Sequence, residues 1–222
     1  IFHSDGLGFR EKGKWWKVVD LKNCAIANEK VNELMQEVLD FFQEPDYFDL
    51  KRQTGTFRYA VIRTPTQTSS ISFVLNANST KIAQAVTKIK EFSKITTAEN
   101  ILVTYVPQKT DMSVSSDYFV VKGIDHLKET FLEKDFEFHA QGFFQNNTAM
   151  AGKMQTYVNK ILKQYDTKKS YLLDLYGGVG TFGIINSDLF SKVTVVEFSK
   201  EAIDSAKVNI KNNHINNAEA LV

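Results

Sequence analysis

The stretch Asp174-Leu-Tyr-Gly-Gly-Val-Gly-Thr-Phe-Gly-Ile184 carries the strongest fold signal in this sequence. It places a GxGxxG run, formed by Gly178, Gly180 and Gly183, directly after the apolar segment 171–173. Glycines in such a loop let the backbone approach a ligand closely, and N–H groups at the start of a following helix favour negative charge. The stretch therefore predicts a strand, a ligand-binding loop and a helix.

The residues on both sides of the loop extend this pattern. Residues 192–197, KVTVVE, are typical of a buried strand that ends in an acid, and residues 199–212 are typical of a helix opened by Ser199. Upstream, residues 136–140 predict a short strand and residues 147–164 a helix. Strands that alternate with helices indicate an α/β fold, here the start of a doubly wound Rossmann-like sheet.

The acid that ends the second strand narrows the choice of ligand. Glu197 lies 23 positions after Asp174 and 17 after Gly180, a spacing that suits a carboxylate binding both ribose hydroxyls of an adenosine. A dinucleotide and S-adenosylmethionine both satisfy this spacing. Asp174 favours S-adenosylmethionine, because a carboxylate at the loop entry repels a pyrophosphate and attracts an ammonium or sulfonium group, directly or through water. The structural alternative is a glycine loop that only turns the chain.

The first part of the sequence has a different order of elements. Alternating apolar residues predict strands, and apolar residues at steps of three and four predict helices. The two segments around TPTQTS are expected to pair as a hairpin. We expect a smaller α+β domain over residues 1–138 and the doubly wound α/β domain over 139–222. In the first domain the expected strands are 14–20, 56–63, 70–75, 101–106 and 118–122, and the expected helices are 28–43 and 79–93.

Composition excludes several classes of protein. The 222 residues carry a formal charge of +1, so no global basic field indicates nucleic acid. One cysteine, Cys24, excludes an internal disulfide framework, and no long apolar run predicts a membrane span. We expect a cytoplasmic protein with no membrane association and no evident obligate protein partner. Without an initiator Met or a signal peptide pattern, the sequence is expected to begin within a longer protein.

A second group of side chains precedes the glycine loop, in the segment 138–148, FHAQGFFQNNT. The paired aromatics Phe143 and Phe144 stand beside amides, which together offer a stacking surface and hydrogen-bonding edges for a flipped base or an adenine. In the plainer interpretation both rings are core residues and Asn147 or Thr148 caps a helix. The segment taken alone favours that plainer interpretation.

The order FFQNNTAMAGKM, LLDLYGGVGTFGI and VVEFSKEAIDSAKVNIKNNHINNAE resembles the RNA uridine-5-methyltransferase family, which makes 5-methyluridine in tRNA or ribosomal RNA. The upstream block GLGFREKGKWWKVVDLKNCAI resembles that family's central domain. The resemblance implies S-adenosylmethionine as cofactor and RNA as partner. It implies cofactor contacts at Gln145, Tyr176, Thr181 and Glu197, beside the loop residues Asp174, Gly178 and Gly180. One departure is Gly177, where the family commonly has Cys.

The resemblance also bears on catalysis. Uracil carbon-5 is a weak nucleophile, so such enzymes are expected to add a cysteine thiolate at carbon-6 and to use a carboxylate base for the carbon-5 proton. The family carries both groups after later strands, so we expect them beyond Val222 and none among these residues. The sequence is thus expected to lack N-terminal and C-terminal parts of the enzyme.

Cys24 falls where many family members have an iron–sulfur ligand. Such a cluster needs four thiolates, and the other three would lie upstream of Ile1. A small buried thiol is the alternative for Cys24.

Two other functions stay open at this point. An NAD-linked oxidoreductase uses the same kind of glycine loop. A non-catalytic RNA-binding module would use a basic and aromatic segment to meet a phosphate backbone and stack on a base, although a solvated strand edge explains the same residues. That segment comprises Arg10, Lys12, Lys14, Trp15, Trp16 and Lys17, while the four histidines, His3, His126, His139 and His214, show no metal-ligand spacing.

Overall fold

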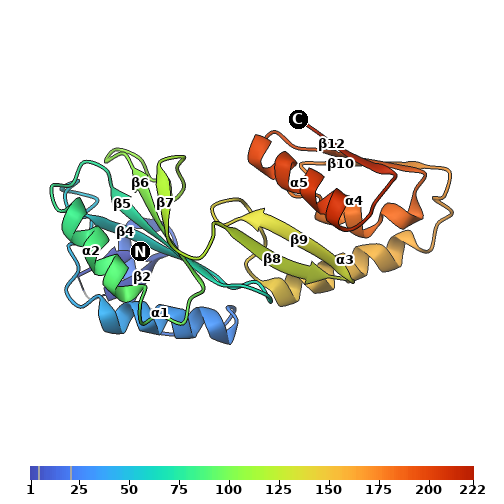
Figure 1. The fold of residues 1–222 in the computed structure, drawn as a ribbon. Coiled ribbons are helices and arrows are strands. Elements are labelled where there is room, and N and C mark those ends of the chain that lie inside the picture. Colours follow the sequence, from blue (N-terminus) through green and yellow to red (C-terminus); the bar gives the residue numbers. More distant parts are fainter. Residues whose placement is uncertain (5, 21) are drawn as a thin grey trace. The chain divides into compact units, whose positions relative to one another are not determined.

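The structure is a computed structural model that describes residues 1–4, 6–20 and 22–222, apart from the side chain of Trp15. The chain forms two compact units (Figure 1). Unit 1 comprises Ile1–Thr64 and Ser69–Asp125, and unit 2 comprises Pro65–Thr68 and His126–Val222. Each unit has its own sheets and helices.

Unit 1 is built on a four-stranded sheet in the order β4-β5-β6-β7. Strands β4 and β5 form the expected antiparallel hairpin, β6 runs parallel to β5, and β7 is antiparallel to β6. Helices α1 and α2 pack their apolar sides on one face of this sheet, where Leu34, Phe73 and Phe92 are fully buried. The bounds are β4 (Phe57–Arg63), β5 (Ser70–Asn76), β6 (Asn100–Val106), β7 (Tyr118–Lys122), α1 (Glu29–Phe41) and α2 (Ile82–Phe92).

Three antiparallel strands precede this sheet: β1 (Phe2–His3), β2 (Gly6–Glu11) and β3 (Lys14–Asp20). Sequence patterning predicted only β3. Helix α1 begins after Asn28, whose side chain accepts a hydrogen bond from the N–H of Val31 at 3.0 Å. This cap, together with an apolar face repeating every three to four residues, explains why the helix was predictable.

Unit 2 contains the parallel sheet β10-β11-β12, as predicted for the start of a doubly wound α/β fold. Strand β12 was not predicted. Figure 1 shows α5 lying along this sheet and α3 along the hairpin β8–β9. The bounds are β8 (His126–Phe131), β9 (Lys134–His139), α3 (Thr148–Leu162), β10 (Tyr171–Leu175), α4 (Thr181–Ile185), a 3₁₀ turn (Ser187–Leu189), β11 (Lys192–Val196), α5 (Lys200–Asn212) and β12 (Ala218–Leu221).

The division between the units lies at Asp125/His126, earlier than the expected boundary near residue 138. The physical reason is that β8 pairs with β9 along its whole length, and β9 in turn bonds to α5. The hairpin therefore belongs to unit 2 as one piece. The turn Pro65–Thr68 also belongs to unit 2, because the buried carboxylate of Glu129 accepts hydrogen bonds from the N–H and hydroxyl of Thr66.

The parallel sheet has one buried face and one exposed face. Val193 and Val195 of β11 are fully buried, whereas Leu173 and Leu175 of β10 are exposed. The segment 192–197, expected to be buried, is thus buried on one face only. No helix within the described parts of the chain has the length and apolar character needed to cross a membrane.

Candidate functional site

The glycine loop leaves β10 through a run of left-handed residues. Tyr176 and Gly178 both have a φ of 55°, and Gly180 has a φ of 86°. Glycine adopts these angles without steric cost, but a tyrosine does so at a cost of about 1–3 kcal/mol. Helix α4 then begins at Thr181. Strain of this kind persists where the surrounding structure enforces it, as at ligand-binding sites.

Glu197 fixes the loop to the end of β11. Its Oε2 accepts a hydrogen bond from the N–H of Gly178 at 3.1 Å, and its Oε1 accepts one from the N–H of Ser199 at 3.0 Å. A third bond runs from the N–H of Gly177 to the carbonyl of Val196 at 3.1 Å. An ionised carboxylate has about four lone-pair sites, so both oxygens keep acceptor capacity for two further hydroxyl donors.

Asp174 closes the loop from the other side. Its Oδ2 accepts a hydrogen bond from the N–H of Gly183 at 2.8 Å. Burial raises the pKa of the Asp174 carboxyl, while the bond from Gly183 opposes the shift. The direct hydrogen-bond partner of the Asp174 carboxylate is therefore the backbone of the loop. The attraction of a cationic ligand to Asp174 stays a prediction.

The loop offers open space next to these acids. A Cβ added at Gly178 would meet no heavy atom within 4 Å. The side chains of Tyr176 and Phe198 are 90% and 92% exposed, and Phe198 directly follows Glu197. Two free aromatic rings, a fixed carboxylate and an open glycine suit an adenosine, which needs apolar faces for the base and an acceptor for the ribose. Sequence reasoning missed Phe198, although its place after the acid was visible.

The aromatic segment before α3 contains both buried and exposed side chains, so each of the two interpretations holds for part of it. Phe144 is buried and stacks on Phe138, with ring centroids 3.9 Å apart and planes at 4°. Asn147 caps α3 by accepting a hydrogen bond from the N–H of Met150 at 3.0 Å. Phe143, by contrast, is 79% exposed, and Gln145 is also exposed. Phe144 thus anchors the segment, while its neighbours on both sides remain free for a ligand.

In unit 1, the backbone of Cys24 is held by the side chain of a helix residue. Its backbone N–H and carbonyl both bond to the amide of Asn32, at 2.8 and 3.3 Å. Within the described residues, no three His, Cys, Asp or Glu side chains gather as a metal site would require. Cys24 is also the one cysteine of the sequence. The residues present therefore do not fit an iron–sulfur cluster by themselves.

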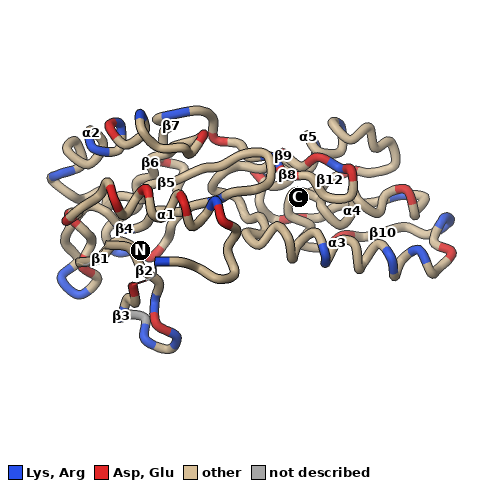
Figure 2. Tube along the Cα trace, turned by 90° about the horizontal axis from the view of Figure 1, so that it is seen from below, with Lys and Arg blue, Asp and Glu red and all other residues tan. Residues whose placement is uncertain are grey.

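Three basic residues of the β2–β3 hairpin are paired with acids. Lys14 and Lys17 both contact the carboxylate of Glu11, at 2.6 and 2.5 Å, and Arg10 forms a bidentate pair with Asp111. Figure 2 shows blue and red side by side at the end of this hairpin. Trp15 lies outside the described side chains, whereas Trp16 is exposed. This pairing weakens the case for the segment as an electrostatic RNA surface.

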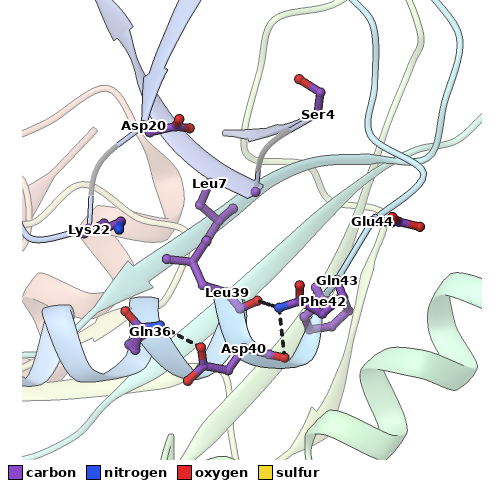
Figure 3. A pocket seen from close by; sticks show the side chains of 11 residues that line it. Ser4, Leu7, Asp20, Lys22, Gln36, Leu39, Asp40, Phe42, Gln43 and Glu44 are labelled. Carbon is purple, nitrogen blue, oxygen red and sulfur yellow. Dashed lines mark hydrogen bonds between the residues drawn. The ribbon is translucent and has the colours of Figure 1, made fainter.

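A pocket of about 750 Å³ lies in unit 1, between the start of the chain and α1 (Figure 3). Leu7 and Leu39 point toward each other in it, and Asp20, Lys22 and Asp40 stand around it. Acids, a base and apolar groups are mixed there, so its lining selects no ligand chemistry. The glycine loop belongs to the other unit and remains the candidate site.

Comparisons with known proteins identify the family of the chain. A family described as tRNA (uracil-5-)-methyltransferase matches residues 7–221. The tRNA (uracil(54)-C(5))-methyltransferase of Pyrococcus abyssi is 29% identical over 221 residues, which is 98% of this chain and 50% of that protein. An uncharacterized RNA methyltransferase of Caldanaerobacter subterraneus is 29% identical over 96% of this chain and 48% of that protein.

Among solved structures, the fold is similar to that of the Pyrococcus abyssi tRNA (uracil-54, C5)-methyltransferase in complex with S-adenosyl-L-homocysteine. The TM-score is 0.76 and the sequence identity 26%, over 98% of this chain and 52% of the other. The chain thus spans about half the length of the relatives that it matches.

Proposed function

This chain belongs to the tRNA (uracil-5-)-methyltransferase family, and on that premise we propose that its unit 2 binds S-adenosylmethionine for methyl transfer to carbon-5 of a uridine in tRNA. The observation that carries the proposal is Glu197, held at the end of β11 with one oxygen on the N–H of Gly178. The similar Pyrococcus abyssi structure contains S-adenosyl-L-homocysteine, the molecule that remains after methyl transfer. Because the chain spans half of its relatives, the complete reaction is proposed for the protein as a whole.

Each site residue has a defined part in this proposal. Glu197 accepts hydrogen bonds from the two ribose hydroxyls. Tyr176 and Phe198 offer apolar surface to the adenine, and Gly178 lets the backbone lie close to the ligand. Gln145 and Thr181, implied by family resemblance, add polar contacts. The bound cofactor supplies an electrophilic methyl group on a cationic sulfur, toward which the charge of Asp174 is attractive.

The pyrimidine needs activation from elsewhere. Carbon-5 attacks the methyl group only after a thiolate has added to carbon-6, and a base must then remove the carbon-5 proton so that the thiolate can leave. We propose that the thiolate does not come from unit 2, whose residues include no cysteine, and that the base acts beside that thiolate. Ribosomal RNA is the second candidate substrate, and the matched family favours tRNA.

Two alternatives are less well supported. An NAD-linked oxidoreductase needs room and positive charge for a pyrophosphate, whereas Asp174 places a carboxylate beside this loop, bonded to the N–H of Gly183. Glu197 suits the ribose of either ligand. A non-catalytic RNA-binding module needs a free basic surface, whereas Lys14 and Lys17 are paired with Glu11. A cluster ligand role for Cys24, and a cytoplasmic location, remain predictions from the sequence.

Isothermal titration of the chain with S-adenosylhomocysteine, S-adenosylmethionine and NAD tests the proposal. We expect the first two to bind and NAD not to bind at the same concentrations. Binding of NAD with no response to the other two would replace the proposed function with the oxidoreductase. A parallel assay with labelled methyl donor and tRNA transcript, repeated with Cys24→Ser, asks whether Cys24 is a nucleophile; we expect no transfer by either form.

A further inference from the structure

A single buried side chain outside the predicted site joins two of its segments. Asn209 of α5 is fully buried, and its amide group bonds to three backbone groups. The Nδ2 donates to the carbonyl of Glu137 and to the carbonyl of Val179, both at 3.1 Å, and the Oδ1 accepts from the N–H of Glu137 at 2.8 Å. Both amide hydrogens and the amide oxygen are therefore engaged.

The two partners of Asn209 belong to different parts of the candidate site. Val179 lies inside the glycine loop, between Gly178 and Gly180. Glu137 lies in β9, and the next residue, Phe138, stacks on Phe144, the residue before Gln145. The amide of Asn209 thus connects the loop that binds Glu197 with the strand that leads to Gln145.

We propose that Asn209 is a positioning residue, which holds the glycine loop at a fixed distance from β9 and so sets the shape of the cofactor site. It does not need to touch the ligand, because the bond to Val179 acts on the loop backbone from the side of α5. This inference rests on the proposed function for the identity of the ligand, but the loop restraint itself does not depend on it.

The chain contains a matched comparison one helical turn later. Asn213 accepts a hydrogen bond from the N–H of Asp135 at 2.9 Å and donates to the carbonyl of Asp135 at 2.7 Å. Its further bond goes back to the carbonyl of Asn209 at 2.8 Å, inside α5 and its cap, instead of to the glycine loop. Asn213 therefore docks β9 as Asn209 does, without the link to Val179.

This difference gives a direct experiment with Asn209→Asp and Asn213→Asp. Each change keeps the shape and the acceptor oxygen, removes the N–H donors and adds one negative charge near the end of α5. We expect Asn209→Asp to speed hydrogen exchange of residues 176–183 in the cofactor-free chain, and to weaken S-adenosylhomocysteine binding about fivefold or more, as expected for loss of a hydrogen bond. Asn213→Asp should alter exchange in β8–β9 and leave the loop and the affinity close to wild type.

Equal effects of the two variants on loop exchange would overturn the proposal. Loss of thermal stability without faster exchange at residues 176–183 would also overturn it, because it would indicate an ordinary core residue. If the unchanged chain fails to bind S-adenosylhomocysteine, the proposed function fails while the exchange measurement still decides the role of Asn209. Should Asn209→Asp not fold, Asn209→Ser, which keeps a short donor and acceptor, is carried through the same measurements.

Discussion

Asp174 and Gly183 face each other across the glycine loop, with Oδ2 of the carboxylate 2.8 Å from the backbone nitrogen. The bond ties the carboxyl end of β10 to α4, so the loop between them is closed by a side chain of its own strand. A Cβ at Gly183 would lie 3.0 Å from methyl groups of both Val193 and Val195 and 3.2 Å from the same carboxylate oxygen. The absence of a side chain at Gly183 therefore allows this close approach.

Replacing Asp174 tests that closure. Asp174→Ala should destabilise the chain by about 1–3 kcal/mol, because the N–H of Gly183 loses its partner. Asp174→Asn keeps a carbonyl oxygen at the same place and should lose much less stability than Asp174→Ala. Urea unfolding followed by circular dichroism measures both, and equal losses for the two variants would show that the bond to Gly183 contributes little. If the charge attracts the cofactor, Asp174→Asn should still weaken S-adenosylhomocysteine binding.

The raised pKa of Asp174 predicts a pH dependence. Because burial makes the ionised form less favourable in the folded chain, the folded pKa lies above the ordinary value of 3.8. The contribution to stability is then complete below pH 3.8 and is lost as the pH rises through the folded pKa. Wild type should lose stability relative to Asp174→Asn over this window, measured by urea unfolding at stepped pH. Parallel curves for both proteins would contradict the shift.

Glu197 should dominate cofactor affinity. Each charge-assisted hydrogen bond to the ribose contributes about 1.5–3 kcal/mol, so Glu197→Ala should weaken S-adenosylhomocysteine binding at least about tenfold. The affinity of Glu197→Gln should lie between those of wild type and Glu197→Ala, because glutamine keeps one oxygen acceptor. Glu201→Gln is the control, because Glu201 is an exposed acid on the first turn of α5 that accepts a hydrogen bond from the hydroxyl of Ser199 and has no bond to the glycine loop among those described. Unchanged affinity in Glu197→Ala, measured by calorimetry, would sink the assignment.

Glu129 should matter for stability rather than for binding. Its fully buried carboxylate accepts from the N–H of Thr66 at 3.1 Å and from the N–H of Thr130 at 2.8 Å. Glu129→Ala leaves those donors without partners and should cost at least about 2 kcal/mol of unfolding free energy. Limited proteolysis should also detect faster cleavage at residues 65–68. Glu133→Ala, an exposed acid in the β8–β9 turn, serves as control, and similar behaviour of the two variants would argue against this role.

Glu129 also explains why part of the fold could not be predicted. The segment HLKETF of β8 mixes charged and apolar residues, and its sequence alone suggests that Glu129 is exposed to solvent. The donor that allows Glu129 to be buried comes from Thr66, which is far away in sequence. Helix α1 was predictable because its cap at Asn28 and its apolar face are local. The same distinction holds in the site: Glu197 and the glycines form a motif of fixed spacing, whereas Asn209 gains its role from Glu137, a partner that spacing does not indicate.

Gly177 marks the point where this chain departs from the family resemblance, which places Cys there. A Cβ at Gly177 would lie 2.6 Å from Cγ1 of Val195, and 3.1 Å from both the Cγ and the carbonyl oxygen of Asp174. Val195 is fully buried, and a branched side chain in a packed strand cannot move aside. The glycine is therefore required by the valine on β11.

The final prediction follows from that contact. Gly177→Ala should destabilise the chain by about 1–3 kcal/mol through overpacking, and Gly177→Cys by more. Val195→Ala alone leaves a cavity and is also destabilising. Combined with Gly177→Ala, however, Val195→Ala removes the methyl group that the new Cβ would contact. The double variant should therefore lose less stability than the sum of the two single losses, by about 0.5–3 kcal/mol. Urea unfolding of all four proteins gives this coupling energy; strictly additive losses would mean that the loop backbone, and not Val195, requires glycine.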